Sequence, residues 1–214
     1  MYKLKILPFL YFQSILIATN YEYPIGWDDL QNNHNWIQVV ETERIKIFKK
    51  QLDISPISAF KAELTSNVNI DILAEVAWLV EESTKIFPNA YITDAGIYTH
   101  INDTTYTAYQ IFNIPFLSKR LYQFNSIKIG NSIHWTKTDT INSKINNNEL
   151  LIPPINFGSW EIITSGDKSK IIYRVCTDPG GEIPLWIVEQ ANQHSLPQML
   201  LDLESYAIKM NKNH

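Results

Sequence analysis

The sequence predicts an α+β fold in which a curved antiparallel β-sheet wraps around a long C-terminal helix. Successive segments with alternating apolar residues fill much of the second half of the chain, and this period of two is typical of strands. A long stretch with apolar residues at helical spacing follows them to the C-terminus. Between the two lies DPGGEIPLW, residues 178–186, whose glycine pair and two prolines indicate an abrupt change of direction.

Length and composition indicate one globular domain. The chain has 214 residues, of which 45% are apolar, and we expect the domain to cover residues 27–210 as a monomer. The formal net charge is -4, and no run of Lys and Arg is longer than a pair. This charge pattern argues against nucleic acid as a partner, because phosphate backbones are bound mainly by clustered cations.

The first 20 residues resemble a secretory signal. Lys3 and Lys5 precede an apolar run from Ile6 to Ala18, as in the n-region and h-region of such signals. This pattern predicts export to the periplasm or the medium, with a mature protein that starts between Thr19 and Trp27. The alternative is an N-terminal helix or strand that packs on the domain of a cytoplasmic protein.

The first half of the domain mixes short strands with one helix. Residues 28–35 predict one or two helical turns, and residues 36–50 predict two strands with a turn near Glu43. Residues 57–66 alternate as a half-buried strand does, with Phe60 on its inward face.

Residues 69–83 place apolar side chains at helical spacing, which predicts a single amphipathic helix. Asn69 is its expected N-cap, because an Asn side chain accepts a hydrogen bond from a free backbone N–H of the first turn. Phe87-Pro88 should end this helical region.

The second half predicts a meander of six strands joined by short turns. These strands are residues 90–101, 104–114, 120–130, 132–140, 155–163 and 170–177. Residues 142–149 are polar enough for a loop. The helix that follows should run from Ile183 to about Lys209, kinked or broken near Pro197. The glycine pair in DPGG permits positive φ at the turn, and Pro184 is tolerated in a first helical turn.

Several short motifs, in this order along the chain, resemble the START domain, a lipid-transfer module of the helix-grip (SRPBCC) superfamily, in its bacterial single-domain form. They are FKAE at 60–63, the helix before Phe87-Pro88, PFLSKR at 115–120, GSW at 158–160 and above all DPGGEIPLW. The resemblance covers about residues 27–210. It implies the helix-grip fold, a deep cavity for one hydrophobic ligand, transient membrane contact and no catalysis.

The sequence departs from the START pattern around Arg120 and in the expected cavity. The family usually has S-D-R-D where this chain has Ser118, Lys119, Arg120 and Leu121, which puts an ion pair of the arginine in doubt. Sterol-binding members carry an acidic and a basic residue at the positions that match Gln110 and Ser126. The resemblance therefore implies that two neutral groups at these positions hold one polar end of the ligand.

Alternation along the strands and spacing along the last helix select the side chains expected to line the cavity. For each of them, an ordinary place in the core is the alternative. The expected cavity residues are Phe60, Tyr106, Gln110, Phe112, Tyr122, Phe124, Ser126, Trp160, Tyr173, Val175, Ile187 and Gln190.

The sequence contains no recognisable catalytic or metal-binding motif. Its five histidines show no ligand spacing, so we expect no metal and no cofactor. His194 and Ser195 are neighbours on a helix and point about 100° apart, which is wrong for a nucleophile and its base. Cys176, the one cysteine, lies in an apolar strand and is expected to be a core residue.

These observations predict a protein that binds and transfers a lipid or another hydrophobic small molecule. The alternative is an enzyme like the polyketide cyclases and dehydratases of the same fold, with a cavity Tyr or His as general acid or base. A third possibility is an interaction scaffold with a filled core, which would show no cavity.

Overall fold

A computed structural model describes residues 21–139 and 150–212. The predicted secretory signal, residues 1–20, and the predicted loop, residues 142–149, lie outside the described residues. Within them, no helix is long and apolar enough to cross a membrane.

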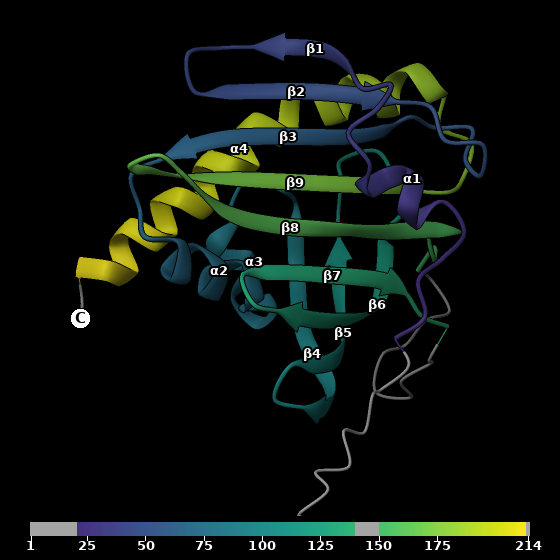
Figure 1. Cartoon of the computed structure of the whole chain (residues 1–214). Helices are drawn as coiled ribbons and strands as arrows, with labels where there is room; N and C mark the ends of the chain where they lie inside the picture. Colours follow the sequence, from purple (N-terminus) through teal and green to yellow (C-terminus); the bar gives the residue numbers. More distant parts are fainter. Residues whose placement is uncertain (1–20, 140–149, 213–214) are drawn as a thin grey trace, which may run out of the picture.

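One antiparallel sheet of nine strands forms the body of the molecule, in the order β1-β2-β3-β9-β8-β7-β6-β5-β4 (Figure 1). The strands from β4 to β9 are sequential neighbours, so the predicted meander is confirmed, and the first three strands extend the sheet beyond β9. The strands are β1 (Ile37–Glu41), β2 (Ile45–Lys50), β3 (Ala59–Ser66), β4 (Ile92–Asn102), β5 (Thr105–Phe112), β6 (Arg120–Ile129), β7 (Ser132–Lys137), β8 (Ile155–Ser165) and β9 (Lys168–Asp178).

The helices lie on both faces of the sheet. They are α1 (Trp27–Gln31), α2 (Ile70–Trp78), the 3₁₀ turn η1 (Val80–Glu82), α3 (Ser83–Ile86) and α4 (Leu185–Lys212). The long α4 crosses one face of the sheet, with α2 and α3 beside it, while α1 packs on the other face (Figure 1). This is the predicted curved sheet around a C-terminal helix.

The predicted single helix at residues 69–83 is wrong in one respect, because it is interrupted at Leu79. Asn69 caps α2 as predicted, with its side chain accepting a hydrogen bond from the Asp71 N–H at 2.7 Å. At the interruption, the Leu79 N–H bonds to the Val76 carbonyl, three residues back instead of four. A 3₁₀ turn keeps the apolar residues on nearly the same side, so the hydrophobic pattern does not reveal the change.

Of the kink or break predicted near Pro197, the break is wrong, because α4 continues for 28 residues through Pro197; the kink stays a prediction. Proline removes one backbone donor, but burial of the residues around it can hold the helix together. Leu196, Leu200, Leu203 and Ala207 are all buried against the sheet and α2.

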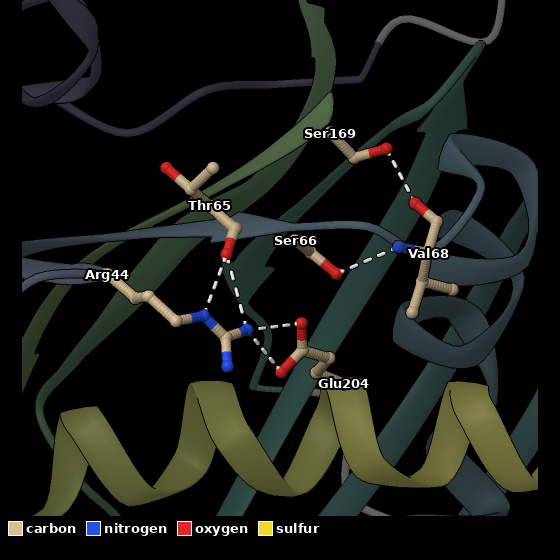
Figure 2. Close-up of polar contacts among 6 residues, drawn as sticks. All are labelled: Arg44, Thr65, Ser66, Val68, Ser169 and Glu204. Carbon is tan, nitrogen blue, oxygen red and sulfur yellow. Dashed lines mark hydrogen bonds and ion pairs between the residues drawn. The ribbon is translucent and has the colours of Figure 1, made fainter. Parts of the chain in front are cut away.

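An ion pair fastens the C-terminal half of α4 to the sheet (Figure 2). Arg44, in the turn between β1 and β2, places Nη2 at 2.5 and 2.6 Å from the carboxylate oxygens of Glu204. The same guanidinium donates to the Thr65 carbonyl of β3 at 3.3 Å. The first residues of the helix are more exposed, with Leu185 and Trp186 at 48% and 68%. Glu189, one turn further on, is held to the sheet by Lys49 at 3.1 Å and by Ser58 at 2.6 Å.

The convex face of the sheet carries a second apolar cluster under α1. Trp27 and Leu30 pack there against Phe157 and Cys176. Burial raises the pKa of the Cys176 thiol to about 11. The prediction that Cys176 is a core residue is confirmed.

His134 lies at the edge of this cluster, and its burial predicts a loss of stability in acid. Its Nδ1 is 2.8 Å from the Tyr23 hydroxyl, and its ring centroid is 4.9 Å from that of Trp27. Burial lowers the pKa of His134 below its ordinary 6.5, while nearby Glu161 raises it and Arg174 lowers it further. Because the unfolded chain then takes up this proton more readily than the folded one, stability should fall as the pH drops below about 6.5.

Replacing His134 with Gln should remove part of this acid sensitivity. We expect urea unfolding between pH 7.5 and 5.5 to show a smaller loss of stability for His134→Gln than for the wild type. The exposed His100→Gln variant is the matched control and should keep the wild-type pH dependence. Parallel pH profiles for the wild type and both variants would contradict the assignment.

The DPGG turn joins β9 to α4 through two residues with left-handed backbone. Gly180 and Gly181 have φ of 69° and 78°, so the prediction of positive φ at the glycine pair is confirmed. The Asp178 carboxylate accepts a hydrogen bond from the Gly180 N–H at 2.8 Å. Pro184 lies one residue before α4, and its carbonyl accepts a hydrogen bond from the Ile187 N–H. The turn thereby sets where the helix begins.

Replacing Gly180 or Gly181 with Val should lower the free energy of unfolding by about 1–3 kcal/mol, because a β-branched residue is strained at positive φ. A Cβ at Gly180 would also lie 2.8 Å from the Leu151 side chain. Gly166→Val is the matched control, since Gly166 has φ of 66° but open space around it. Urea unfolding should show a larger loss for Gly180→Val than for Gly166→Val. Wild-type stability of both DPGG variants would mean that neither position needs glycine.

Candidate ligand-binding site

A pocket of about 680 Å³ lies between the concave face of the sheet, the region from α2 to α3, and the N-terminal half of α4. Most of the side chains around it are apolar or aromatic. The residues predicted for the cavity that line this pocket are Tyr106, Gln110, Phe112, Tyr122, Phe124, Ser126, Trp160, Tyr173, Val175 and Ile187. Their contact with a ligand stays a prediction.

Phe60 and Gln190 do not line the pocket. Phe60 does face inward, as alternation predicts, but it is 1% exposed and packed within the core. Gln190 is exposed on α4, because the helix turns Val188, Ala191 and Ser195 toward the pocket instead. Alternation and helical spacing identify a face, whereas the packing of the neighbouring elements decides which part of that face stays open.

The strand register separates the two neutral groups that the resemblance places at one polar end of the ligand. Gln110 pairs with Tyr122 across β5 and β6, and Ser126 pairs with Tyr106. The two polar residues are therefore four positions apart along the strands, about 13 Å at 3.3 Å per residue. A single polar end of a ligand at both groups stays a prediction. The pocket has two separate polar positions.

The first polar position lies deep in the pocket, where Tyr106 and Ser126 are each 2% exposed. The Tyr106 hydroxyl donates to the Trp78 carbonyl at 3.1 Å and also forms a hydrogen bond with Ser126. Burial raises the pKa of Tyr106, so the phenol stays neutral. This position offers hydrogen bonding without charge.

The second polar position joins β5 to the start of α3. The Gln110 amide nitrogen donates to Ser83 Oγ at 2.8 Å, and Ser83 Oγ donates to the Val80 carbonyl at 2.5 Å. Sequence reasoning missed Ser83. The sequence did contain one indication of its role: Ser83 is a polar residue three positions after Val80, on the inward side of the amphipathic segment.

Two further tyrosines bring phenol groups to the pocket wall. The Tyr122 ring lies 4.9 Å from that of Phe112, and the Tyr173 ring lies 4.3 Å from that of Trp160. Burial raises the pKa of both hydroxyls. Neither hydroxyl has a hydrogen-bond partner among the described residues, so both can serve a ligand.

Arg120, at one end of the pocket, binds backbone carbonyls in place of the missing aspartates. It is 2% exposed, and it donates to the Pro179 carbonyl at 3.1 Å, the Gly180 carbonyl at 3.3 Å and the Ser118 carbonyl. Within the described part of the chain it forms no ion pair. The sequence had put an ion pair of this arginine in doubt because the two aspartates of the START pattern are missing. In the structure the arginine instead holds the DPGG turn through hydrogen bonds to the peptide backbone.

The described residues contain no group of three or more His, Cys, Asp and Glu side chains that could hold a metal ion. His194 lies at the pocket but is exposed, with Nδ1 at 2.8 Å from the Gln190 carbonyl of its own helix. The polar chemistry of the pocket therefore comes mainly from hydroxyl and amide groups.

No protein-family model matches the sequence, and no curated protein matches it. Solved structures do match the fold. A STAR-related lipid transfer protein from Xanthomonas axonopodis is 19% identical, with a TM-score of 0.68 over 81% of this chain and 98% of that one. Human STARD10 is 14% identical, with a TM-score of 0.73 over 86% of this chain and 78% of that one.

Enzymes share this fold as well. The Zhui aromatase/cyclase from a Streptomyces species is 10% identical, with a TM-score of 0.51 over 72% of this chain and 93% of that one. The architecture thus defines a helix-grip protein of the α+β class. Within that class, the fold of the chain is START-like, in agreement with the resemblance seen in the sequence motifs.

Proposed function

We propose that this protein binds one lipid or other hydrophobic small molecule in the pocket and transfers it between membranes. The observation that carries the proposal is a pocket of about 680 Å³ whose wall is mostly apolar, with hydroxyl and amide groups and two charged residues, Arg120 and Asp202. Ligand pockets of about 300–1,000 Å³ with this composition bury most of an apolar molecule and orient it by a few hydrogen bonds. The lipid-transfer proteins among the similar structures support it.

Entry of the ligand should involve movement at the start of α4. Leu185, Trp186 and Ile187 are exposed there, and Phe116 is fully exposed in the loop before β6. Arg44 and Glu204 fix the C-terminal half of the helix (Figure 2). Opening of the N-terminal half would break the contacts of Glu189 with Lys49 at 3.1 Å and with Ser58 at 2.6 Å. Exposed aromatic side chains of this kind favour transient contact with a lipid surface.

The second candidate is a cyclase-like enzyme, supported by the aromatase/cyclase structures and by the free phenols of Tyr122 and Tyr173. A general base must lose its proton near the working pH. Burial raises the pKa of both phenols, which makes them hydrogen-bond donors and poor bases. The raised pKa values therefore argue against either phenol as a general base.

Probe binding with a pocket-filling variant tests the proposal. We expect the wild type to bind a fluorescent sterol or fatty-acid probe, and Ser126→Trp to lose this binding, because an indole at the deep end occupies the pocket. Ala191→Trp fills the pocket from the exposed side of α4 and should act in the same way if Ser126→Trp does not fold.

Thr164→Trp, at an exposed position of β8, is the matched control and should keep wild-type binding. Circular dichroism should show that the variants are folded. Wild-type binding by a folded Ser126→Trp variant would place the ligand elsewhere. Failure of the wild type to bind any apolar probe would overturn the proposal, and turnover of polyketide substrates would then support the enzyme.

A further inference from the structure

Ser83 has a single hydroxyl proton, and the structure shows where that proton goes. Ser83 is 1% exposed, and its Oγ lies 2.5 Å from the Val80 carbonyl oxygen. A carbonyl oxygen can only accept, so the hydroxyl must donate to it. Toward any other neighbour, Ser83 Oγ is left as an acceptor.

This fixes the orientation of the Gln110 side chain. The atom of Gln110 at 2.8 Å from Ser83 Oγ must be the amide nitrogen, because the serine has no second proton to give to an oxygen. The usual ambiguity between the oxygen and nitrogen of an amide is therefore resolved by the hydrogen-bond pattern. The carbonyl end of Gln110 is turned away from Ser83.

The carbonyl oxygen of Gln110 is available to a ligand. It accepts no hydrogen bond from any of the described residues, and it is not among their fully buried unpaired polar atoms, which are Thr105 Oγ1, Gln123 Nε2 and Arg174 Nε. Since Gln110 lines the pocket, this oxygen is reached from the pocket.

Tyr122 is the cross-strand neighbour of Gln110 on the pocket wall. It pairs with Gln110 across β5 and β6, and paired side chains on one face have Cβ atoms about 4.5–5.5 Å apart. Its phenol can donate or accept, and it has no partner among the described residues. The pocket wall thus carries the Gln110 carbonyl oxygen, which can only accept a hydrogen bond, and on the next strand the Tyr122 hydroxyl, which can also donate one.

An alcohol matches this arrangement, because one hydroxyl can donate to Gln110 and accept from Tyr122. A ketone can only accept, so it leaves the Gln110 oxygen unpaired in a buried site. Hydrogen-bond matching therefore distinguishes ligands whose apolar bodies are identical.

We propose that Ser83 is a positioning residue that locks the Gln110 amide, so that the pocket selects a hydrophobic alcohol over the matching ketone. The inference rests on the proposed function, since it names the class of ligand that the same pocket takes.

The test compares matched probes on the full chain. Dehydroergosterol, which carries a 3-hydroxyl, and its 3-keto analogue form one pair, and a pyrene-labelled long-chain alcohol and its methyl ketone form the second. The comparison uses the pair that binds more tightly. Within it, we expect the wild type to bind the alcohol about tenfold or more tightly than the ketone, because the ketone leaves one acceptor of the protein without a hydrogen bond.

Two variants and a control separate positioning from general stability. Gln110→Leu should lower the alcohol-to-ketone ratio of affinities toward one, and Ser83→Ala should lower it because the freed amide can turn its nitrogen to the ligand. Ser169→Ala removes a buried serine that donates to the Val68 carbonyl outside the pocket at 2.6 Å, and it should keep the wild-type ratio (Figure 2). If Ser83→Ala does not fold, the alcohol-to-ketone ratio of Gln110→Leu still tests whether Gln110 selects the alcohol.

Equal affinity of the wild type for alcohol and ketone, or tighter binding of the ketone, would overturn this inference while leaving the proposed function standing. An unchanged ratio in folded Gln110→Leu would overturn it too. Failure of the wild type to bind any member of either pair would overturn the inference, and the proposed function would fall with it only if the fatty-acid probe also failed to bind.

Discussion

Replacing Gly158 with Ala is expected to cost about 3 kcal/mol or more of folding stability, and to leave little folded protein if the domain is marginally stable. Gly158 lies on β8, opposite Trp135 of β7 and Val175 of β9. A Cβ at this position would overlap the Arg174 backbone carbonyl and the Trp135 indole, whose Cη2 would be only 2.8 Å away. Backbone and a buried indole cannot both move aside, so the strands would have to separate.

Gly96→Ala is the matched control, because Gly96 is also a strand glycine without positive φ. A Cβ there would approach only the Tyr109 ring and hydroxyl, at 3.0–3.3 Å, and that side chain is free to shift slightly. Urea unfolding should therefore show a much smaller loss for Gly96→Ala. Similar unfolding midpoints for the two variants would show that the sheet accommodates a side chain at Gly158.

Gly158 also illustrates what the sequence could and could not reveal. The GSW motif drew attention to this glycine through a resemblance, but its physical role depends on which residue lies opposite it. The register that sets Gly158 against Trp135 is a contact between two strands that residues 138–154 separate along the chain. Alternation within one strand carries no information about that pairing.

The inner faces of the strands were predictable because period-two alternation depends only on local sequence. Tyr106, Tyr122 and Tyr173 reach the pocket for this reason. Phe60 obeys the same alternation, yet it is enclosed by the core. A concave sheet lines both pocket and core with one face, so the open part is decided by where the helices pack.

The polar positions of the pocket were less predictable. Gln110 and Ser126 were both identified, but the register that separates them is fixed by pairing between β5 and β6. Ser83 looked like one more residue of an amphipathic helix, and its role appears only when the 3₁₀ turn brings it to Val80 and Gln110. Hydrogen-bond networks between distant segments leave little trace in a single sequence.

Replacing Arg120 with Met is expected to lower the free energy of unfolding by about 2–4 kcal/mol, because it removes the shared donor of three backbone carbonyls. Two of these carbonyls belong to Pro179 and Gly180, in the turn that sets the start of α4. A loosened turn should also free the N-terminal half of the helix, which covers the pocket. We therefore expect faster release of a bound fluorescent sterol in stopped-flow measurements, beyond the loss of stability seen in urea unfolding.

The comparison of Arg120→Lys with Arg120→Met shows whether charge or shape matters at this position. A guanidinium presents several N–H groups in a planar fork, whereas an ammonium is a compact point charge on a flexible stem. Lysine keeps the charge but cannot reproduce the three directed hydrogen bonds, so it should recover only a small part of the lost stability. Lys119→Met, at the exposed neighbouring residue, controls for loss of charge and should behave as the wild type. Full stability of Arg120→Lys would show that positive charge alone holds the turn, and full stability of Arg120→Met would show that the three carbonyls find other donors.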